Sequence, residues 1–250
     1  MPVFGKQDVE AAATQAPLMS GLDTDAWELK GAEILQLSYE IAEEPAEWLI
    51  PPALHPSIPP YATFSVMHYP DSPVGPFALA QVRIIVRAGI RPRGYLLHAY
   101  ASTEQAVGEL QARWGFTVET AAVSLQPRHD RVIGRVERDG DTLLEIELEN
   151  PEHISGADIT YLDSLHLARV QDQDKPVIVQ VDPEYVFQAA QRGKPRLLTF
   201  KAGAWGDSGR LQCTTPIIAT MTKSDTDLPQ LRFALDPSLP AAQGSRRLAA

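Results

Sequence analysis

Hydrophobic and polar residues alternate with a period of two over much of this chain, which is the pattern of strands with one buried and one exposed face. Within the predicted strand 143–149, the three aliphatic residues Leu144, Ile146 and Leu148 alternate with three glutamates. The preceding Asp139-Gly140-Asp141 predicts a hairpin back to residues 131–137, because glycine tolerates the positive φ that such turns need. Runs of branched and aromatic residues predict further strands over residues 79–86, 95–100, 159–170, 177–181, 197–200, 217–221 and 231–235.

Two segments carry helix signals instead. Ser102-Thr103-Glu104-Gln105 has the spacing of a capping box, and apolar residues follow at helical intervals as far as Trp114. Asp182-Pro183 predicts the start of a second helix that ends at Gly193. Nine prolines between residues 45 and 76 restrict that region to loops and short strands. The predicted fold class is α+β, mainly antiparallel β, with a few short helices and a closed or nearly closed β-barrel.

A single domain is predicted. The chain has 250 residues, 44% of them hydrophobic, which is enough for a sizeable core, and no repeat or linker divides it. Residues 1–24 and 238–250 are small and polar and lack a sustained apolar period. They are predicted to be a flexible N-terminal arm and a flexible C-terminal tail around a domain of residues 25–237.

Charge and composition narrow the list of partners. A net charge of −10 without a basic run argues against nucleic-acid binding, which needs a positive surface. No apolar run is long enough to span a membrane and no leader pattern begins the chain, so we expect a cytoplasmic protein. The lone Cys213 excludes an internal disulfide and is interpreted as a small buried hydrophobe rather than a nucleophile. The six histidines show no metal-binding spacing, so no metal site is predicted.

Several short motifs follow one another in an informative order. They are Trp48-Leu-Ile-Pro-Pro-Ala-Leu-His-Pro56, Phe64-Ser-Val-Met-His68, Gly75-Pro-Phe77, Gly94-Tyr-Leu-Leu-His-Ala-Tyr100, Arg113-Trp-Gly-Phe116 and Gly134-Arg-Val-Glu-Arg-Asp-Gly140. This order resembles the acetoacetate decarboxylase superfamily over roughly residues 30–236. In that family a G-P-Y strand, a Y-L strand and a short helix lead to a W-G-[FY]-P-K-K segment.

The resemblance implies a cone-like closed barrel with an apolar interior, in which a lysine of depressed pKa forms a Schiff base with the substrate. No cofactor is implied. The lysine position falls on Val118 and its neighbouring lysine on Glu119, and neither residue can form an imine. The resemblance aligns the two acidic site residues of the family with positions near Leu79 and Thr63, and its site arginine with a position near Ala32. Decarboxylation through an imine is therefore not predicted.

Two remaining residues are candidate acids or bases. Glu119 is the first choice, because a carboxyl group in an apolar interior has a raised pKa; the alternative is a surface acid. His98 is the second, since period two puts it on one face with Leu96 and Tyr100 and its ordinary pKa suits proton transfer. Its alternative is a hydrogen-bonded core histidine.

Other positions are candidate substrate-binding residues. Arg83 interrupts an apolar strand and is a candidate partner for a substrate carboxylate, or else an exposed residue of an edge strand. His68 is also a candidate substrate-binding residue; the alternative is a purely structural role. The remaining candidates would shape the cavity wall: Leu79, Tyr100, Trp114, Phe116 and Val118.

Two functions stay open. The preferred hypothesis is an acetoacetate decarboxylase-like enzyme that uses acid/base chemistry (cyclisation, dehydration, enolisation or imine-independent decarboxylation) on a keto-acid or polyketide-like molecule, in specialised metabolism. The alternative is a non-catalytic barrel that binds an apolar small molecule. An enzyme needs a titratable group in its pocket, whereas the binding barrel predicts a purely apolar interior. Assembly into a homo-oligomer is left open.

Overall fold

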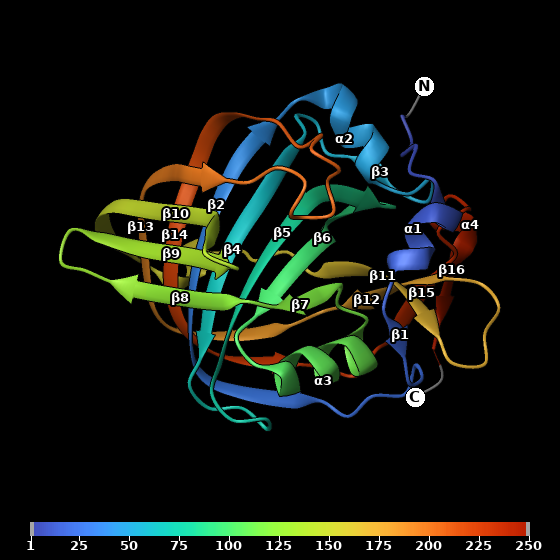
Figure 1. Cartoon of the computed structure of the whole chain (residues 1–250), viewed down its shortest axis with the longest axis horizontal. Helices are drawn as coiled ribbons and strands as arrows, with labels where there is room; N and C mark the ends of the chain where they lie inside the picture. The colour runs from blue at the N-terminus through green and yellow to red at the C-terminus, as the bar shows by residue number, and fades with distance from the viewer. Residues whose placement is uncertain (1–2, 249–250) are drawn as a thin grey trace.

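A computed structural model of the chain describes residues 3–248 as one strongly curled sheet with a few short helices around it (Figure 1). The strands are β1 Leu18–Met19, β2 Trp27–Ile41, β3 His55–Pro56, β4 Tyr61–Tyr69, β5 Phe77–Ala88, β6 Arg91–Ala101, β7 Val118–Thr120, β8 Ala122–Pro127, β9 Arg131–Arg138, β10 Asp141–Ile154, β11 Ser164–Val170, β12 Val177–Val181, β13 Glu184–Phe200, β14 Cys213–Leu228, β15 Phe233–Leu235 and β16 Ser245–Arg247. The helices are α1 Val9–Gln15, α2 Glu43–Leu49, α3 Glu104–Trp114 and α4 Ala241–Gly244, with one 3-10 turn, η1, at Gly156–Asp158.

The sheet is mainly antiparallel, as predicted. Its strands follow the order β16-β15-β12-β11-β6-β5-β4-β2-β14-β13-β10-β9-β8, and among the described residues only the pairs β1–β11, β6–β11 and β6–β7 are parallel. Within residues 3–248 no hydrogen-bonded ladder joins β16 to β8, so the path stays open. The mainly antiparallel class with short helices is confirmed, and closure of the barrel stays a prediction.

Local sequence signals explain the best-predicted elements. The β9–β10 hairpin turns at Asp139 and Gly140, whose φ angles are 53° and 83°, as a two-residue turn with left-handed backbone requires. α3 begins after Thr103, whose hydroxyl accepts a hydrogen bond from the Ala106 amide at 3.3 Å. It ends at Gly115, which adopts φ 64°. No helix in the described part of the chain is long and apolar enough to cross a membrane.

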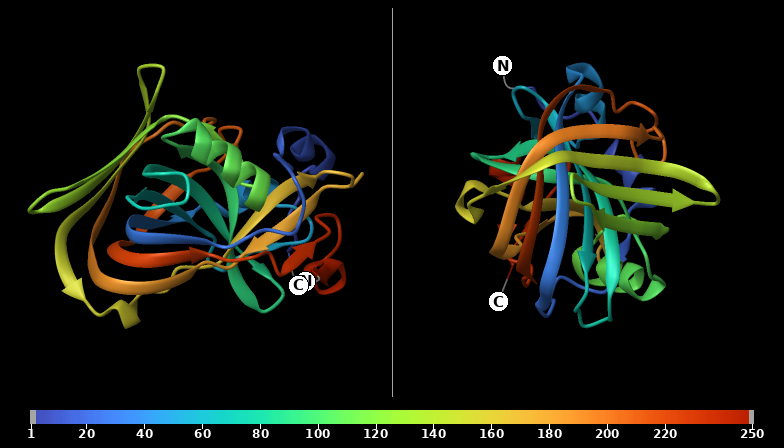
Figure 2. Two further views of the ribbon diagram at one scale, coloured as in Figure 1. Left: turned by 90° about the horizontal axis from the view of Figure 1, so that it is seen from below. Right: turned by 90° about the vertical axis from the view of Figure 1, so that its left-hand side faces the viewer.

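Alternate residues of the central strands fill two cores on opposite faces of the sheet. On β5, Val82 belongs to the first core and Leu79 to the second. β9 covers the first core so closely that a Cβ at Gly134 would lie 2.8 Å from the Cβ of Val66. α3 covers the second core and buries Trp114 in it, and Figure 2 shows this helix lying across the curled sheet.

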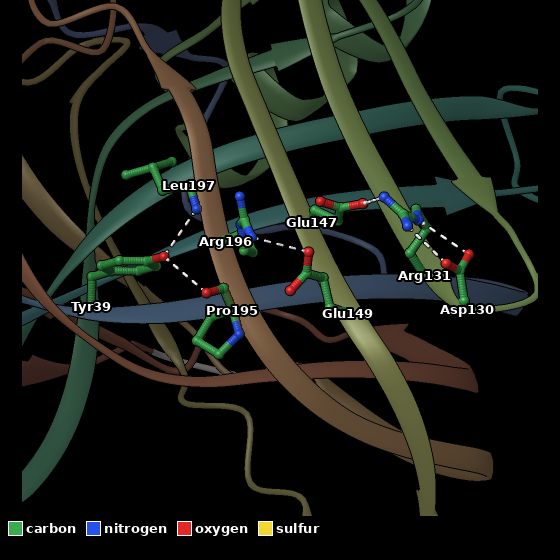
Figure 3. A network of polar contacts seen from close by, with 8 residues as sticks. All are labelled: Tyr39, Asp130, Arg131, Glu147, Glu149, Pro195, Arg196 and Leu197. Atoms are coloured by element: carbon green, nitrogen blue, oxygen red, sulfur yellow. Dashed lines mark hydrogen bonds and ion pairs between the residues drawn. The ribbon is translucent and has the colours of Figure 1, made fainter.

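Polar side-chain contacts, in addition to packing, join β2 to β13 and β9 to β10 (Figure 3). The hydroxyl of Tyr39 on β2 accepts a hydrogen bond from the Leu197 amide at 2.9 Å and donates one to the Pro195 carbonyl at 3.2 Å on β13. Arg131 of β9 donates to Glu147 of β10 at 2.8 Å. Glu147 lies on the face of this hairpin expected to be exposed, but its pairing with Arg131 allows it to be buried.

The predicted helix over residues 182–193 is wrong. This segment is the first half of β13, which pairs with β14 on one side and with β10 on the other. Its Tyr185-Val186-Phe187 run favours extended backbone and pairs with β14, and residues 190–192 pair with β10 as well. The Asp182-Pro183 signal precedes a strand instead.

Both chain ends are packed in the structure, unlike the predicted arm and tail; residues 1–2 and 249–250 lie outside the described part. α1 and β1 belong to the N-terminal segment, and Met19 of β1 is fully buried beside β11. At the other end α4 leads into β16, which pairs with β15. Backbone pairing holds both segments despite their polar composition.

Candidate active site

A pocket of about 890 Å³ lies against the β6 strand on the side of the first core. Its walls come from four parts of the chain: the N-terminal segment 6–16, the end of α2, residues 95–100 of β6 and the loop 203–210. Glu119 of β7 and Arg138 of β9 also line it. The volume is that of a site for a medium-sized organic molecule.

His98 reaches this pocket because β6 contains an irregularity. His98 pairs with Val82 and Leu96 with Arg83, so Leu97 is an extra residue in the strand. Leu96 therefore packs in the second core while Tyr100 belongs to the first. The predicted common face of Leu96, His98 and Tyr100 is wrong for Leu96, since a bulge shifts the alternation by one residue.

The His98 ring is buried and has an unsatisfied nitrogen. Its Nε2 makes no hydrogen bond to any described residue and lies 3.7 Å from Oε1 of Glu119. The ring meets Tyr100 edge-on, with centroids 4.8 Å apart. Burial lowers the pKa of His98; the positive charge of Arg138 lowers it further, and the Glu119 carboxylate raises it in part. The imidazole is thus neutral near pH 7 and can accept a proton.

Glu119 does not occupy the apolar interior predicted for it. Its side chain is 48% exposed and forms an ion pair with Arg138. Val118 is only 2% exposed and belongs to the second core, because consecutive residues of β7 point to opposite faces. The Arg138 guanidinium also lies 5.9 Å from the centre of the Tyr100 ring. Glu119 is therefore an ion-paired neighbour of His98 rather than a desolvated acid.

The loop 203–210 forms a pocket wall that sequence analysis missed. Gly206 adopts φ 68° and lies so near β6 that a Cβ there would be 2.9 Å from the Leu97 carbonyl oxygen. Asp207 is fully buried and accepts hydrogen bonds from the amides of Gly203 at 2.6 Å and Leu211 at 3.2 Å. The glycines and the aspartate of this segment signal a tight loop, but only the fold brings that loop to β6.

The mouth of the pocket carries cations. Lys6 and the Arg210 guanidinium each lie 5.7 Å from the centre of the Trp48 ring. Lys6 also pairs with Glu47, whereas Arg210 has no acidic partner within the described residues. An anionic group on a ligand would meet favourable charge at this edge.

The other predicted site residues lie elsewhere. Leu79, Arg83 and Phe116 line a smaller cavity of about 30 Å³ on the opposite face of the sheet. Arg83 is 4% exposed, so the alternative of an exposed edge position is wrong. Val118 and Trp114 are buried in the second core and line neither cavity.

His68 lies apart from both cavities. Its Nδ1 is 3.8 Å from the Glu33 carboxylate, and its side chain is partly exposed. Tyr100 lines the large pocket and donates a hydrogen bond to the Ala204 carbonyl at 2.7 Å. The candidate residues therefore form two separate groups, with only His98, Tyr100 and Glu119 in the large pocket.

Within residues 3–248, no three His, Cys, Asp or Glu side chains converge on a point where they could hold a metal ion. The absence of a cofactor stays a prediction. Cys213 is half-buried, and burial raises the pKa of its thiol to about 11. The thiol is therefore protonated near neutral pH and is a poor nucleophile.

Comparison with known proteins extends the sequence resemblance. The family model "Acetoacetate decarboxylase (ADC)" matches residues 13–232. No curated protein sequence gives a significant match.

Several solved structures share the fold. An acetoacetate decarboxylase from Legionella pneumophila superposes with a TM-score of 0.75 at 14% identity, covering 84% of this chain and 88% of that one. The enduracididine biosynthesis enzyme MppR, complexed with pyruvate, gives 0.67 at 14% identity, with 90% and 91% covered. An acetoacetate decarboxylase-like enzyme from Sphingomonas wittichii RW1 gives 0.66 at 14% identity, with 84% and 92% covered.

Proposed function

Since this chain belongs to the acetoacetate decarboxylase family, we propose that it is an enzyme of that fold which lacks the imine-forming lysine and works by acid/base chemistry. Its substrate is a keto-type small molecule bound in the large pocket. The proposal rests on His98, a pocket-lining residue whose buried Nε2 makes no hydrogen bond and lies beside the ion-paired carboxylate of Glu119.

Imine chemistry finds no support in the pocket. Val118 stands at the family's lysine position and packs among apolar side chains. Lys6 is the one lysine among the residues that line the pocket, and its ammonium group pairs with Glu47 at the mouth. A half-exposed, ion-paired amine lacks the burial that activates a Schiff-base lysine.

His98 acts as the base in a proton transfer. The neutral Nε2 removes a proton from the carbon next to the substrate carbonyl, and the C–H electron pair forms the carbon–carbon double bond of an enolate. The negative charge that develops on the carbonyl oxygen is stabilised by the nearby Arg138 guanidinium. The imidazolium then returns its proton to carbon, which completes a hydrogen exchange, or gives it to the enolate oxygen, which completes an enolisation. Where the neighbouring carbon bears a hydroxyl group, that group leaves with the proton as water, which completes a dehydration.

Glu119 has a supporting role in this scheme. Its carboxylate, 3.7 Å from His98 Nε2, stabilises the imidazolium that forms when the ring accepts a proton. This makes Glu119 a positioning residue that acts through His98, and it reverses the order of the two candidates expected from sequence. The charged and polar groups in the pocket favour an enzyme over a barrel that only holds an apolar ligand.

Exchange of carbonyl-activated protons tests the proposal without knowledge of the natural substrate. The protein is incubated in D₂O with pyruvate, acetoacetate or acetylacetone, and deuterium incorporation is followed by NMR. We expect exchange above the buffer rate that falls by about 10²–10⁴-fold in His98→Gln. His129→Gln is the matched control, because His129 is exposed and outside the pocket. Equal exchange by His98→Gln, or no exchange of any probe by the parent protein, would overturn the assignment.

A further inference from the structure

Two separate groups of polar side chains line the large pocket. Glu119 and Arg138 lie with His98 in one group, and Arg210 lies beside Trp48 at the mouth in the other. A pocket of about 890 Å³ is far larger than a three- or four-carbon keto acid requires. A substrate that fills it therefore extends from the first group toward the second.

Arg210 is the cation at the mouth that has no counter-ion among the described residues. Asp8 and Glu119 are the acids that line the pocket. The Asp8 carboxylate accepts a hydrogen bond from a backbone amide at the start of α1, at 3.1 Å, and Glu119 is ion-paired as described above. Glu47 pairs with Lys6. The Arg210 guanidinium is exposed and unpaired, so its N–H groups are free to bind an anionic group of a ligand.

The loop 203–210 limits how far Arg210 lies from His98. A Cβ at Gly206 would be 3.8 Å from the Cβ of His98, so the loop touches β6 there. The Arg210 amide then donates to the Asp207 carbonyl at 2.8 Å, which closes a turn. The ends of such a turn lie less than about 7 Å apart, so the Cα of Arg210 is within about 11 Å of the Cα of Gly206.

Electrostatics sets a lower limit on the same separation. Among the arginines that line the pocket, Arg138 lowers the pKa of His98, whereas Arg210 has no part in that shift. Arg210 therefore lies beyond the range of about 8–10 Å within which charges interact strongly. Both limits together put the guanidinium of Arg210 on the order of 10–15 Å from the imidazole of His98.

We propose that the substrate is an oxo acid whose carboxylate is remote from its reacting keto group, with Arg210 binding the carboxylate and His98 facing the keto end. This inference rests on the acid/base function proposed above. A span on the order of 10–15 Å corresponds to about eight to twelve carbon–carbon bonds of about 1.5 Å each in a zigzag chain. A planar carboxylate matches the fork of N–H groups on a guanidinium. Aliphatic lining residues would contact the chain: Ala12, Ala16, Leu49, Leu97 and Leu167.

Calorimetric titration of the intact protein tests the carboxylate site separately from catalysis. The ligands are 10-oxoundecanoate and its uncharged methyl ester. We expect the acid to bind about tenfold more tightly, because hydrogen bonds to a charged group are the stronger ones. Equal affinities, or tighter binding of the ester, would overturn the proposal.

Two arginine variants tie this preference to the mouth of the pocket. Arg210→Met should remove the preference for the acid. Arg232→Met is the matched control and should keep it, since Arg232 is also exposed and without an acidic partner in the described residues but does not line the pocket. A preference that survives Arg210→Met, or that disappears in Arg232→Met, contradicts the assignment.

The length of the ligand tests the span. Deuterium exchange next to the keto group is measured as kcat/KM for each acid and its methyl ester. The acid should exceed the ester by about tenfold for 10-oxoundecanoate, and it should have no advantage for 4-oxopentanoate. The short chain cannot join Arg210 to His98. An equal advantage of the acid at both lengths would contradict the span.

His98→Gln separates the two proposals. This variant should lose exchange of 10-oxoundecanoate and keep the tighter binding of the acid. A parent protein that prefers the acid in binding but exchanges no probe would refute the acid/base function and support the carboxylate site. Exchange by the parent without any preference for the acid would refute the carboxylate site alone.

Discussion

Val118 and Glu119 are consecutive residues of β7, yet their side chains belong to different sites. Val118 is buried in the second core with Leu79, whereas Glu119 reaches the large pocket and pairs with Arg138. Period-two alternation of a strand causes this separation. The two positions that the sequence resemblance aligns with the family's neighbouring lysines therefore face opposite sides of the sheet in this chain.

The absence of an imine can be tested directly. Incubation with acetoacetate and borohydride should leave the protein mass unchanged, because the Val118 position offers no amine and Lys6 is ion-paired. Intact-mass spectrometry makes the measurement. A stable adduct of reduced-imine mass on any lysine would contradict the prediction, and Lys6→Gln would show whether the pocket lysine carries it.

Restoring the lysines should not restore decarboxylation. In Val118→Lys with Glu119→Lys, the first amine would enter an apolar core without a neighbouring acid, because the sequence resemblance aligns the family's acids with Leu79 and Thr63. The second amine points to the other face and removes the partner of Arg138. We expect no carbon dioxide release from acetoacetate above the parent level. Release well above it, from a variant with a native circular dichroism spectrum, would show that substrate orientation survives.

Two substitutions should move the pH profile of proton exchange in opposite directions. The neutral form of His98 is the base, so the rate should fall on acidification with an apparent pKa below the ordinary histidine value of about 6.5. Arg138→Met removes a cation that lowers this pKa, and the acid limb should move to higher pH. Glu119→Gln removes the anion that raises it, so the limb should move to lower pH. Arg128→Met, at an exposed site outside the pocket, is the control.

If the acid limb moves in the same direction in Arg138→Met and Glu119→Gln, or moves in neither, His98 is not the base. A purely structural role of Glu119 would change the rate without moving the limb. The profile therefore separates an electrostatic partner from a packing residue.

His166 should make the fold sensitive to acid. Its imidazole is buried and neutral, and burial lowers its pKa to about 3. The unfolded chain takes up a proton at this residue below about pH 6.5 while the folded chain does not, so stability is lost as the pH falls from that value toward 3. At pH 5 the loss amounts to about 2 kcal/mol relative to pH 7. Urea unfolding at both pH values should show it, and His166→Asn should show a difference smaller by about that amount. An unchanged difference would contradict the prediction.

Two glycines should respond oppositely to alanine. In Gly134→Ala the new methyl group would clash with Val66, where β9 crosses β4, and we expect a loss of about 1–3 kcal/mol. Gly108 lies within α3 with open space around it, so Gly108→Ala should raise stability by up to about 1 kcal/mol. Denaturant unfolding of both variants is the measurement. Similar changes in stability for the two variants would contradict the close contact between Gly134 of β9 and Val66 of β4.

Elements with local causes could be predicted from the sequence. The hairpin at Asp139-Gly140 depends on backbone freedom at two residues, and α3 depends on Thr103 and Gly115 at its ends. The alternation along β10 marks a strand whatever its neighbours are. The motif order also indicated the family, because it reflects the succession of these elements.

Only the tertiary structure decided which side chains share a cavity. β13 is a strand rather than a helix because β10 and β14 lie on either side of it, and no signal within the segment reports those neighbours. The extra residue Leu97 moves His98 and Leu96 to different faces, since one inserted residue reverses the alternation beyond it. The loop at Asp207 lies more than 100 residues from His98 in the chain and closes the same pocket. Residue types are local, but burial, pairing and charge neighbours arise from contacts between distant segments, and these set the chemistry of the site.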